Sequence, residues 1–314
     1  MRVVSLLASG TEIVCALGAG DALVGRSHEC DNPEWVRDLP ACTRPAFNVT
    51  GSSRDIDAEV RRRVKANEPL YDVDADLINK LTPDLLITQV HCDVCAVTPN
   101  DVARAGCAVL TRQVVSLSAG TVAGIYDGIR TVAHALDRSE AGEDLIADMQ
   151  ARIDAVTALV RGRPVPTIVL LEWTDPMFAT GNWGPELVEA AGGMLLLGEK
   201  GRHSTALPWE QVLEADPDYL IVAPCGFDLD RTMQEVPVLE RLPDWFNLTA
   251  VKKGHVVLAD GNKYFNRSGI TIVETVQILG DILHGDRVER HWHGVAWRNY
   301  HVPSARGEPA RVCA

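Results

Sequence analysis

Residues 84–95 read DLLITQVHCDVC, a short apolar run that ends in a glutamine, an imidazole and two thiols. Leucine and isoleucine in so short a run, introduced by Thr82-Pro83, predict a strand buried inside a parallel sheet. Ligands of open α/β sheets bind at the carboxyl ends of such strands. We therefore expect the polar residues that follow this run to belong to a ligand site: Gln89, His91, Cys92 and Cys95.

The composition is that of a large globular protein. With 314 residues, of which 46% are hydrophobic, the chain can bury a large core, and its length favours two lobes over one. No apolar stretch approaches ~20 residues without charges, so the sequence predicts no transmembrane helix. The net charge of −13 disfavours nucleic acid or an anionic membrane as a partner.

The apolar start of the chain predicts a strand that enters a helix, and not a signal peptide. The run at 1–7 soon meets Thr11-Glu12, and no small-residue cleavage site follows it. We therefore expect a cytoplasmic protein; a leader removed from this numbering would make it periplasmic or lipid-anchored, with disulfides. The eight cysteines are diluted in a long chain, which favours reduced thiols with some in a metal or reactive site.

The hydrophobic pattern divides the chain into four regions. Residues 1–120 alternate predicted strands (2–7, 22–27, 84–88, 107–110 with 114–117) with helices, apart from a loop at 40–53. Residues 121–163 carry apolar side chains at helical spacing, broken only around 137–139, and predict a long connecting helix. Residues 164–284 form a second α/β series with strands at 167–171, 219–223 and 256–259, and 285–314 form a surface tail. The predicted fold is α/β, with two Rossmann-like lobes of parallel sheet joined by a long backbone helix.

Thiols and imidazoles follow several of the predicted strands, on the side expected to face a cleft between the lobes. Such side chains suit zinc or an iron–sulfur cluster, but a single Cys-x-x-Cys also fits a redox pair or coincidence. An enzyme with activated thiols, and Glu29 or Asp228 as acid or base, is the alternative reading. Cys15 and Cys107 fit inert burial instead. The candidate metal ligands are His28, Cys30, His91, Cys92, Cys95 and Cys225.

Aromatic residues gather near loop signals in the second series. Burial in the core is the ordinary role of each one, yet several around one edge favour a flat, largely apolar ligand. In the first lobe, the start of the first helix is expected to face the carboxyl edge of the sheet. The triplet Arg61-Arg62-Arg63 is interpreted as a solvated helix face or an anion site. The candidate ligand-binding residues are Thr11, Glu12, Gln89, Trp173, Asn182, Trp183, Trp209, Phe227, Asp228, Asn262, Tyr264, Phe265 and Arg267, with His203 and Asn266 beside them.

Six stretches together resemble the substrate-binding proteins of cobalamin and ferric-siderophore importers. They are RVVSLLASGTEIVCALG at 2–18, LVGRSHECDNP at 23–33, LTPDLLITQ at 81–89, ATGNW at 179–183, EADPDYLIV at 214–222 and YFNRSG at 264–269. The His28-Glu29-Cys30 and His91-Cys92-x-x-Cys95 groups resemble those of a non-secreted branch described as cobalamin-binding.

The resemblance implies a fold of two lobes bridged by one long helix. It also implies a small-molecule metal chelate as ligand, such as cobalamin or another corrinoid, held by aromatic side chains around Trp183, Trp209 and 264–267. A membrane importer is the implied partner if the protein is exported. Without export, the resemblance implies a corrinoid carrier or sensor.

Overall fold

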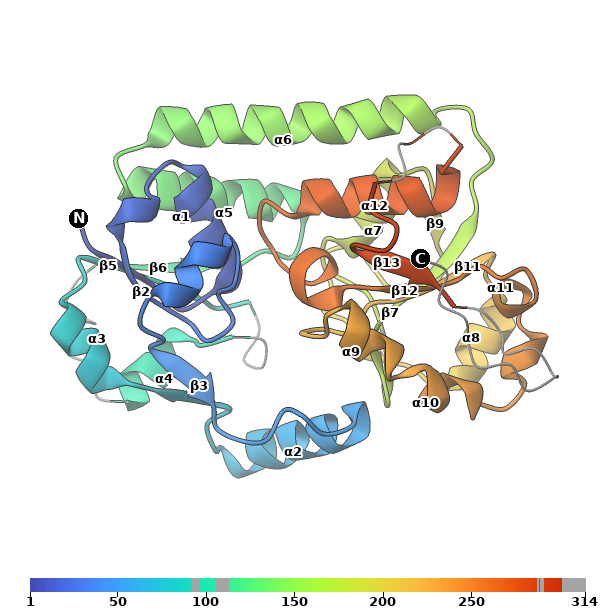
Figure 1. The fold of residues 1–314 in the computed structure, drawn as a ribbon, viewed down its shortest axis with the longest axis horizontal. Coiled ribbons are helices and arrows are strands. Elements are labelled where there is room, and N and C mark those ends of the chain that lie inside the picture. Colours follow the sequence, from blue (N-terminus) through green and yellow to red (C-terminus); the bar gives the residue numbers. More distant parts are fainter. Residues whose placement is uncertain (92–95, 106–112, 287, 289–290, 301–314) are drawn as a thin grey trace. The chain divides into compact units, whose positions relative to one another are not determined.

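The computed structural model describes residues 1–91, 96–105, 113–286, 288 and 291–300 (Figure 1). Cys92, Cys95 and the predicted strand at 107–110 lie outside these ranges. The chain forms two compact units, each with its own sheet. Unit 1 contains Met1–Met149 and Ser268–Ile270, and unit 2 contains Gln150–Arg267 and the residues from Thr271 onward.

Unit 1 is built on a parallel sheet of four strands in the order β2-β1-β5-β6. Its strands are β1 (Val3–Ser5), β2 (Leu23–Arg26), β5 (Leu85–Gln89) and β6 (Gln113–Leu117). Every residue of β5 is buried, which explains why its sequence is a continuous apolar run and does not alternate. The apolar run predicted as a strand at 84–88 is therefore an interior strand, β5, of this sheet.

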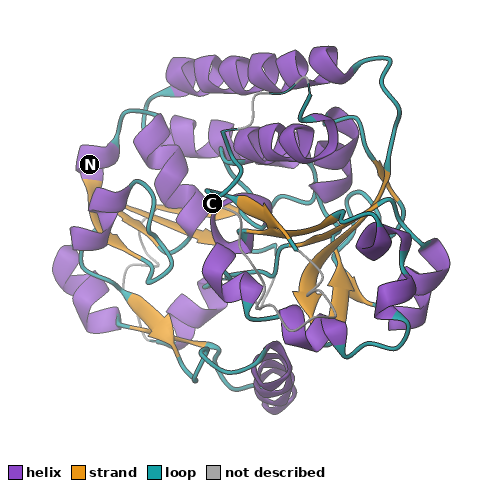
Figure 2. Cartoon of the chain, turned by 45° about the vertical axis from the view of Figure 1, so that its right-hand side comes forward, coloured by secondary structure: helices purple, strands orange, loops and turns teal. Residues whose placement is uncertain are grey.

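Helices follow the strands of unit 1 along the chain, as the α/β pattern predicts. Figure 2 draws the helices in purple and the strands in orange. Several begin at a side-chain cap, such as the Thr98 hydroxyl in its capping box with Asp101. The region 40–53, expected to be loop, contains the short strand β3 (Thr43–Pro45), which pairs antiparallel with β4 (Tyr71–Val73). The helices are α1 (Ala8–Ala16), α2 (Ser53–Ala66), α3 (Ala75–Leu81), α4 (Pro99–Arg104) and α5 (Val122–Ala135), with 3-10 turns at Gly20–Ala22 and Glu34–Asp38.

The connecting region consists of two helices, α5 and the 22-residue helix α6 (Ser139–Val160). They are separated where the sequence predicts a break, because Asp137 adopts a left-handed backbone conformation with φ of 56°. The division between the units falls inside α6, after Met149. Helix α6 therefore carries the chain from the first segment of unit 1 into unit 2.

The sheet of unit 2 is mixed and has seven strands, with the path β10-β8-β7-β11-β12-β13 and β9 beside β7. The predicted strands β7, β11 and β12 are parallel neighbours. Strands β8, β10 and β13 are antiparallel additions that the prediction of parallel sheets did not include. The strands are β7 (Thr167–Thr174), β8 (Met177–Ala179), β9 (Met194–Leu195), β10 (Thr205–Ala206), β11 (Tyr219–Val222), β12 (Val256–Ala259) and β13 (Trp297–Asn299).

The expectation of a surface tail after residue 284 differs from the structure, because β13 pairs with β12 and buries Trp297 and Tyr300. Short strands of three residues carry too little periodicity to be predicted. The helices of unit 2 are α7 (Gly184–Ala190), α8 (Trp209–Ala215), α9 (Leu229–Met233), α10 (Val236–Glu240), α11 (Thr249–Lys252) and α12 (Ile272–His284), with a 3-10 turn at Trp245–Asn247 and a π-helical turn at Gly261–Phe265.

Among the described helices, none combines the length and the apolar character that crossing a membrane requires.

Candidate functional site

An aromatic and cationic stack lies at the carboxyl edge of unit 2. Trp173 is near the end of β7, and Phe227 follows β11, the next strand in the sheet. Their ring centroids are 5.1 Å apart. The guanidinium carbon of Arg231 lies 4.0 Å from the centroid of the Phe227 ring, within the range of a cation–π contact. Trp173 is half-buried, so this stack combines apolar faces with a charged group.

A buried carboxylate holds Arg231 in place. Glu235 is 2% exposed, and its Oε1 accepts a hydrogen bond from the Arg231 guanidinium at 2.6 Å. The other oxygen, Oε2, accepts from the Thr174 hydroxyl at 2.5 Å. Asp228, a predicted ligand residue, accepts from the backbone N–H of Arg231 at 2.8 Å and thereby caps α9. Arg231 is therefore held at two points, because Asp228 binds its backbone N–H and Glu235 binds its guanidinium.

The turn after β12 joins this stack through its backbone. The N–H of Asn262 donates to the carbonyl of Phe227 at 3.0 Å. Asn266 ties the turn down, since its Nδ2 donates to the carbonyls of Ala223 and Gly261 at 2.9 Å each. Asp260 caps the turn by accepting from the N–H of Lys263, and burial raises the pKa of its carboxyl.

Three predicted ligand residues on this turn are buried in the structure. Tyr264, Phe265 and Arg267 are each 6% exposed. Arg267 Nε donates to the carbonyl of Asn262 at 2.8 Å, and Lys263 Nζ lies 5.5 Å from the centre of the Tyr264 ring. The carboxyl ends of β7, β11 and β12 thus bring together residues that are about ninety positions apart in the chain.

The loop before α7 is shaped by its backbone. Asn182 has φ of 53°, its N–H donates to the carbonyl of Arg202 at 2.6 Å, and its carbonyl accepts from Gly201 at 2.9 Å. Trp183, at the start of α7, is 8% exposed, whereas His203 is exposed.

Trp209, also predicted as a ligand residue, is a core residue in the structure. It is 7% exposed and belongs to a hydrophobic core cluster of unit 2. Its Nε1 donates to the carbonyl of Pro243 at 2.7 Å, and its ring lies 6.0 Å from that of Trp245. Buried tryptophan commonly combines ring packing with one such hydrogen bond. Packing accounts for the burial of Trp209, and its contact with a ligand stays a prediction.

The carboxyl edge of unit 1 brings together the start of α1 and the segment after β2. The Thr11 hydroxyl donates to Cys30 Sγ at 3.0 Å, and Asn32 Nδ2 donates to Glu12 Oε1 at 3.0 Å. Thr11, Glu12 and Cys30 are all almost fully buried. The thiol of Cys30 is thus part of a tight polar contact under the sheet edge.

Gln89, at the end of β5, organises the chain that follows this strand. Its Nε2 donates to the carbonyl of Ala96 at 2.9 Å, and the Thr88 hydroxyl donates to the carbonyl of Val97. Gln89 is 4% exposed. Its amide therefore has a structural role on this loop, whatever else it contacts.

His28 is neutral at physiological pH. Burial, and then the positive charge of Arg26, lower the pKa of this imidazole to about 4. Its Nδ1 lies 2.8 Å from the Thr43 hydroxyl, and its ring lies 5.6 Å from that of Tyr71. Because the ring is uncharged, Glu29 Oε1 at 3.9 Å does not form an ion pair with it at neutral pH. A neutral imidazole is the form that ligates metals.

The predicted metal site stays a prediction. Cys92 and Cys95 lie outside the described residues, and His91 is half-buried. Within the described ranges there is no group of three or more His, Cys, Asp or Glu side chains arranged to hold a metal ion. Cys30 is buried, whereas Cys225 is exposed.

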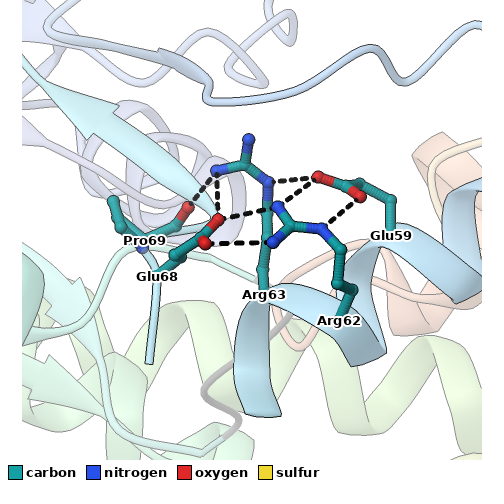
Figure 3. A network of polar contacts seen from close by, with 5 residues as sticks. All are labelled: Glu59, Arg62, Arg63, Glu68 and Pro69. Carbon is teal, nitrogen blue, oxygen red and sulfur yellow. Dashed lines mark hydrogen bonds and ion pairs between the residues drawn. The ribbon is translucent and has the colours of Figure 1, made fainter. Parts of the chain in front are cut away.

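The triplet Arg61-Arg62-Arg63 is a salt-bridged helix face, as the simpler of its two interpretations predicts. Figure 3 shows the contacts of Arg62 and Arg63. Arg62 donates to both Glu59 and Glu68, with its shortest contacts at 2.8 and 2.7 Å. Arg63 donates to Glu59 at 2.7 Å and to the carbonyl of Pro69 at 2.9 Å, and Arg61 pairs with Asp57 at 2.6 Å. These side chains already have anionic partners, which removes the reason to expect an anion site here.

Arg231, Glu235 and Thr174 were not among the residues predicted from the sequence. A signal for two of them exists, since Arg231, in the helix that Asp228 caps, lies four residues before Glu235, which is the i, i+4 spacing of a salt bridge. Nothing in the sequence indicates that Thr174, on a separate strand, completes the network.

Comparison with known proteins agrees with the two-unit fold. A model of the protein family described as periplasmic binding protein matches residues 3–262. No curated protein sequence matches the chain. A periplasmic heme binding protein from Pseudomonas aeruginosa has a similar structure, with 18% identity, a TM-score of 0.68 and coverage of 91% of this chain and 93% of that one.

Two further solved structures are similar along nearly their whole length. The periplasmic heme-binding protein RhuT from Roseiflexus sp. RS-1 has 24% identity and a TM-score of 0.64, with coverage of 90% of this chain and 98% of that chain. The periplasmic vitamin B12 binding protein BtuF of Vibrio cholerae has 19% identity and a TM-score of 0.64, with coverage of 90% and 96%. At these identities the similarity establishes the fold.

Proposed function

We propose that this chain, which belongs to the periplasmic binding protein family, binds a flat metal chelate of the corrinoid class at the carboxyl edge of unit 2. The observation that carries the proposal is the stack of Trp173, Phe227 and Arg231. A half-buried indole and a guanidinium fixed by a buried carboxylate offer an apolar face and a polar rim. Large planar macrocycles with polar substituents need that combination.

The names of similar structures support the ligand class. Solved structures with this fold include proteins described as binding vitamin B12 and proteins described as binding heme. Both ligands are planar tetrapyrrole-type chelates with a central metal. The ordered turn at Gly261–Phe265, tied to Phe227 by the Asn262 N–H, supplies backbone and side-chain polar groups next to the stack.

Absorption spectroscopy tests the proposal directly. The purified chain is titrated with hydroxocobalamin, and the visible bands of the corrinoid are expected to shift with saturation at micromolar ligand. Hemin is titrated in parallel to distinguish a corrinoid site from a porphyrin site. No spectral change with hydroxocobalamin at micromolar concentration would overturn the corrinoid proposal.

Matched variants locate the binding. Trp173→Ala and Phe227→Ala each remove one ring of the stack, and each is expected to weaken binding by about tenfold. Phe246→Ala is the control, because Phe246 lies in the same unit and is 52% exposed. Equal affinity in all three variants would show that the ligand binds away from the stack.

A further inference from the structure

The chain beyond α12 returns to the carboxyl end of β12. Strand β13 pairs antiparallel with β12, and its first residue, Trp297, is opposite Ala259, the last residue of β12. The N–H of Asp260 donates to the carbonyl of Ala296 at 2.9 Å. Because the two strands run in opposite directions, residues just before β13 lie where the turn at Gly261–Phe265 begins.

Residues 292–297 form a compact turn at this position. The N–H of Ala296 donates to the carbonyl of Trp292 at 2.9 Å, and that of Gly294 donates to the carbonyl of Trp297 at 2.8 Å. The ring of His293 meets the ring of Trp297 at 4.7 Å. This turn presents the Trp292 ring to Tyr264, with centroids 5.4 Å apart and planes inclined by 69°, a favourable geometry for an aromatic pair.

The turn is anchored on its far side by buried polar contacts. Trp297 Nε1 donates to Asp281 Oδ2 at 2.9 Å, and the two residues are 3% and 0% exposed. The Tyr300 hydroxyl donates to Glu240 at 2.5 Å, and the Tyr300 ring packs edge-on against Trp245. Trp292 therefore belongs to a turn that buried hydrogen bonds hold in place.

Tyr264 in turn contacts the groups nearest the proposed site. Its carbonyl accepts from the Thr275 hydroxyl at 2.6 Å, which fixes its backbone to α12. The Lys263 ammonium lies over its ring. The Trp292 ring and the Lys263 ammonium both contact the Tyr264 ring, so the turn at 292–297 contributes to the orientation of this ring.

We propose that Trp292 is a positioning residue for ligand recognition: it fixes the Tyr264 ring and, through it, the Lys263 ammonium at the edge of the ligand site. This inference rests on the proposed function for its ligand. Trp292 lies beyond residue 262, where the match to the family model ends. The turn therefore adds to the candidate site a residue outside the part of the chain that the family model matches.

Binding measurements provide the first test. Hydroxocobalamin is titrated against Trp292→Ala, Trp292→Phe and the control Trp35→Ala, which removes a tryptophan that is 45% exposed in unit 1. Trp292→Ala is expected to weaken binding by about tenfold, and Trp292→Phe to restore most of the affinity because it keeps an aromatic edge. Unchanged or tighter binding by Trp292→Ala overturns the inference.

A second readout does not depend on the ligand. In amide NMR spectra, the Lys263 and Tyr264 signals are expected to shift in Trp292→Ala and to stay in place in Trp35→Ala. If the wild-type chain binds no corrinoid, the proposed function fails, while unchanged Tyr264 signals still decide against the positioning role. If Trp292→Ala does not fold, Trp292→Leu replaces it, since it keeps apolar volume without an aromatic ring; wild-type affinity and wild-type signals in that variant overturn the inference.

Discussion

The guanidinium of Arg231 lies 4.0 Å above the ring of Phe227 while its Nη1 donates to Glu235 at 2.6 Å. The aromatic ring and the buried carboxylate therefore fix one cation from two directions. Neither contact alone determines the plane of the guanidinium. Together they make the carboxyl edge of β11 a rigid surface, which favours binding because little side-chain freedom is lost.

Arg231→Lys is expected to weaken hydroxocobalamin binding about three- to tenfold, because an ammonium cannot stack flat on Phe227 while paired with Glu235. The unfolding midpoint is expected to change little, since the charge pair is kept. Arg298→Lys is the control, as Arg298 is also partly buried in unit 2 and lies 3.6 Å from Asp230. An equal loss of affinity in both variants would contradict a specific role for Arg231.

Trp209→Ala is expected to destabilise the protein by about 3–5 kcal/mol, because it leaves a cavity in the core of unit 2. Trp209→Phe fills most of that volume and loses chiefly the hydrogen bond to Pro243, so its cost is expected to be about 1–2 kcal/mol. Chemical denaturation measures both values. Phe246→Ala, at an exposed position, is the control and is expected to change stability by less than about 0.5 kcal/mol.

Stability is expected to fall as the pH decreases from about 6.5 to about 4, because His28 is held neutral in the fold. The unfolded imidazole gains its proton near pH 6.5 and the folded one only near pH 4, so protonation favours the unfolded chain inside this window. Discounted for partial exposure, the loss is roughly 2 kcal/mol. Urea denaturation at several pH values measures it. His28→Gln should lack this part of the pH slope; an unaltered slope would assign the effect to other groups.

The pKa of the Glu59 carboxyl is expected to rise when Arg62 is replaced by alanine. Hydrogen bonds from Arg62 and then Arg63 lower the pKa of Glu59 to about 2. In Arg62→Ala the pKa should rise toward the ordinary value near 4.5, and stay below it because Arg63 remains. Carbon-detected NMR titration of Glu59 measures the change. Arg61→Ala is the matched control: Arg61 pairs with Asp57, so the Glu59 pKa should not move.

The helices and strands that were predicted with nearly correct bounds are those whose own residues show a clear hydrophobic pattern. The continuous apolar run of β5, the strand at 256–259 and the helix at 209–215 all have bounds close to those observed. Short antiparallel strands such as β8, β10 and β13 lack such signals. Their pairing depends on partners far along the chain, so only the folded sheet defines them.

The candidate site shows the same division. The sequence by itself placed aromatic and polar residues after β7, β11 and β12, because strand order and carboxyl ends follow from the α/β pattern. Only the tertiary structure decided what each aromatic residue packs against. Trp173 stacks with Phe227, Trp209 lies in the core, and the ring of Tyr264 contacts that of Trp292. The burial of a tryptophan depends on the side chains that pack against it from distant segments of the chain. The sequence pattern around the tryptophan does not identify those side chains.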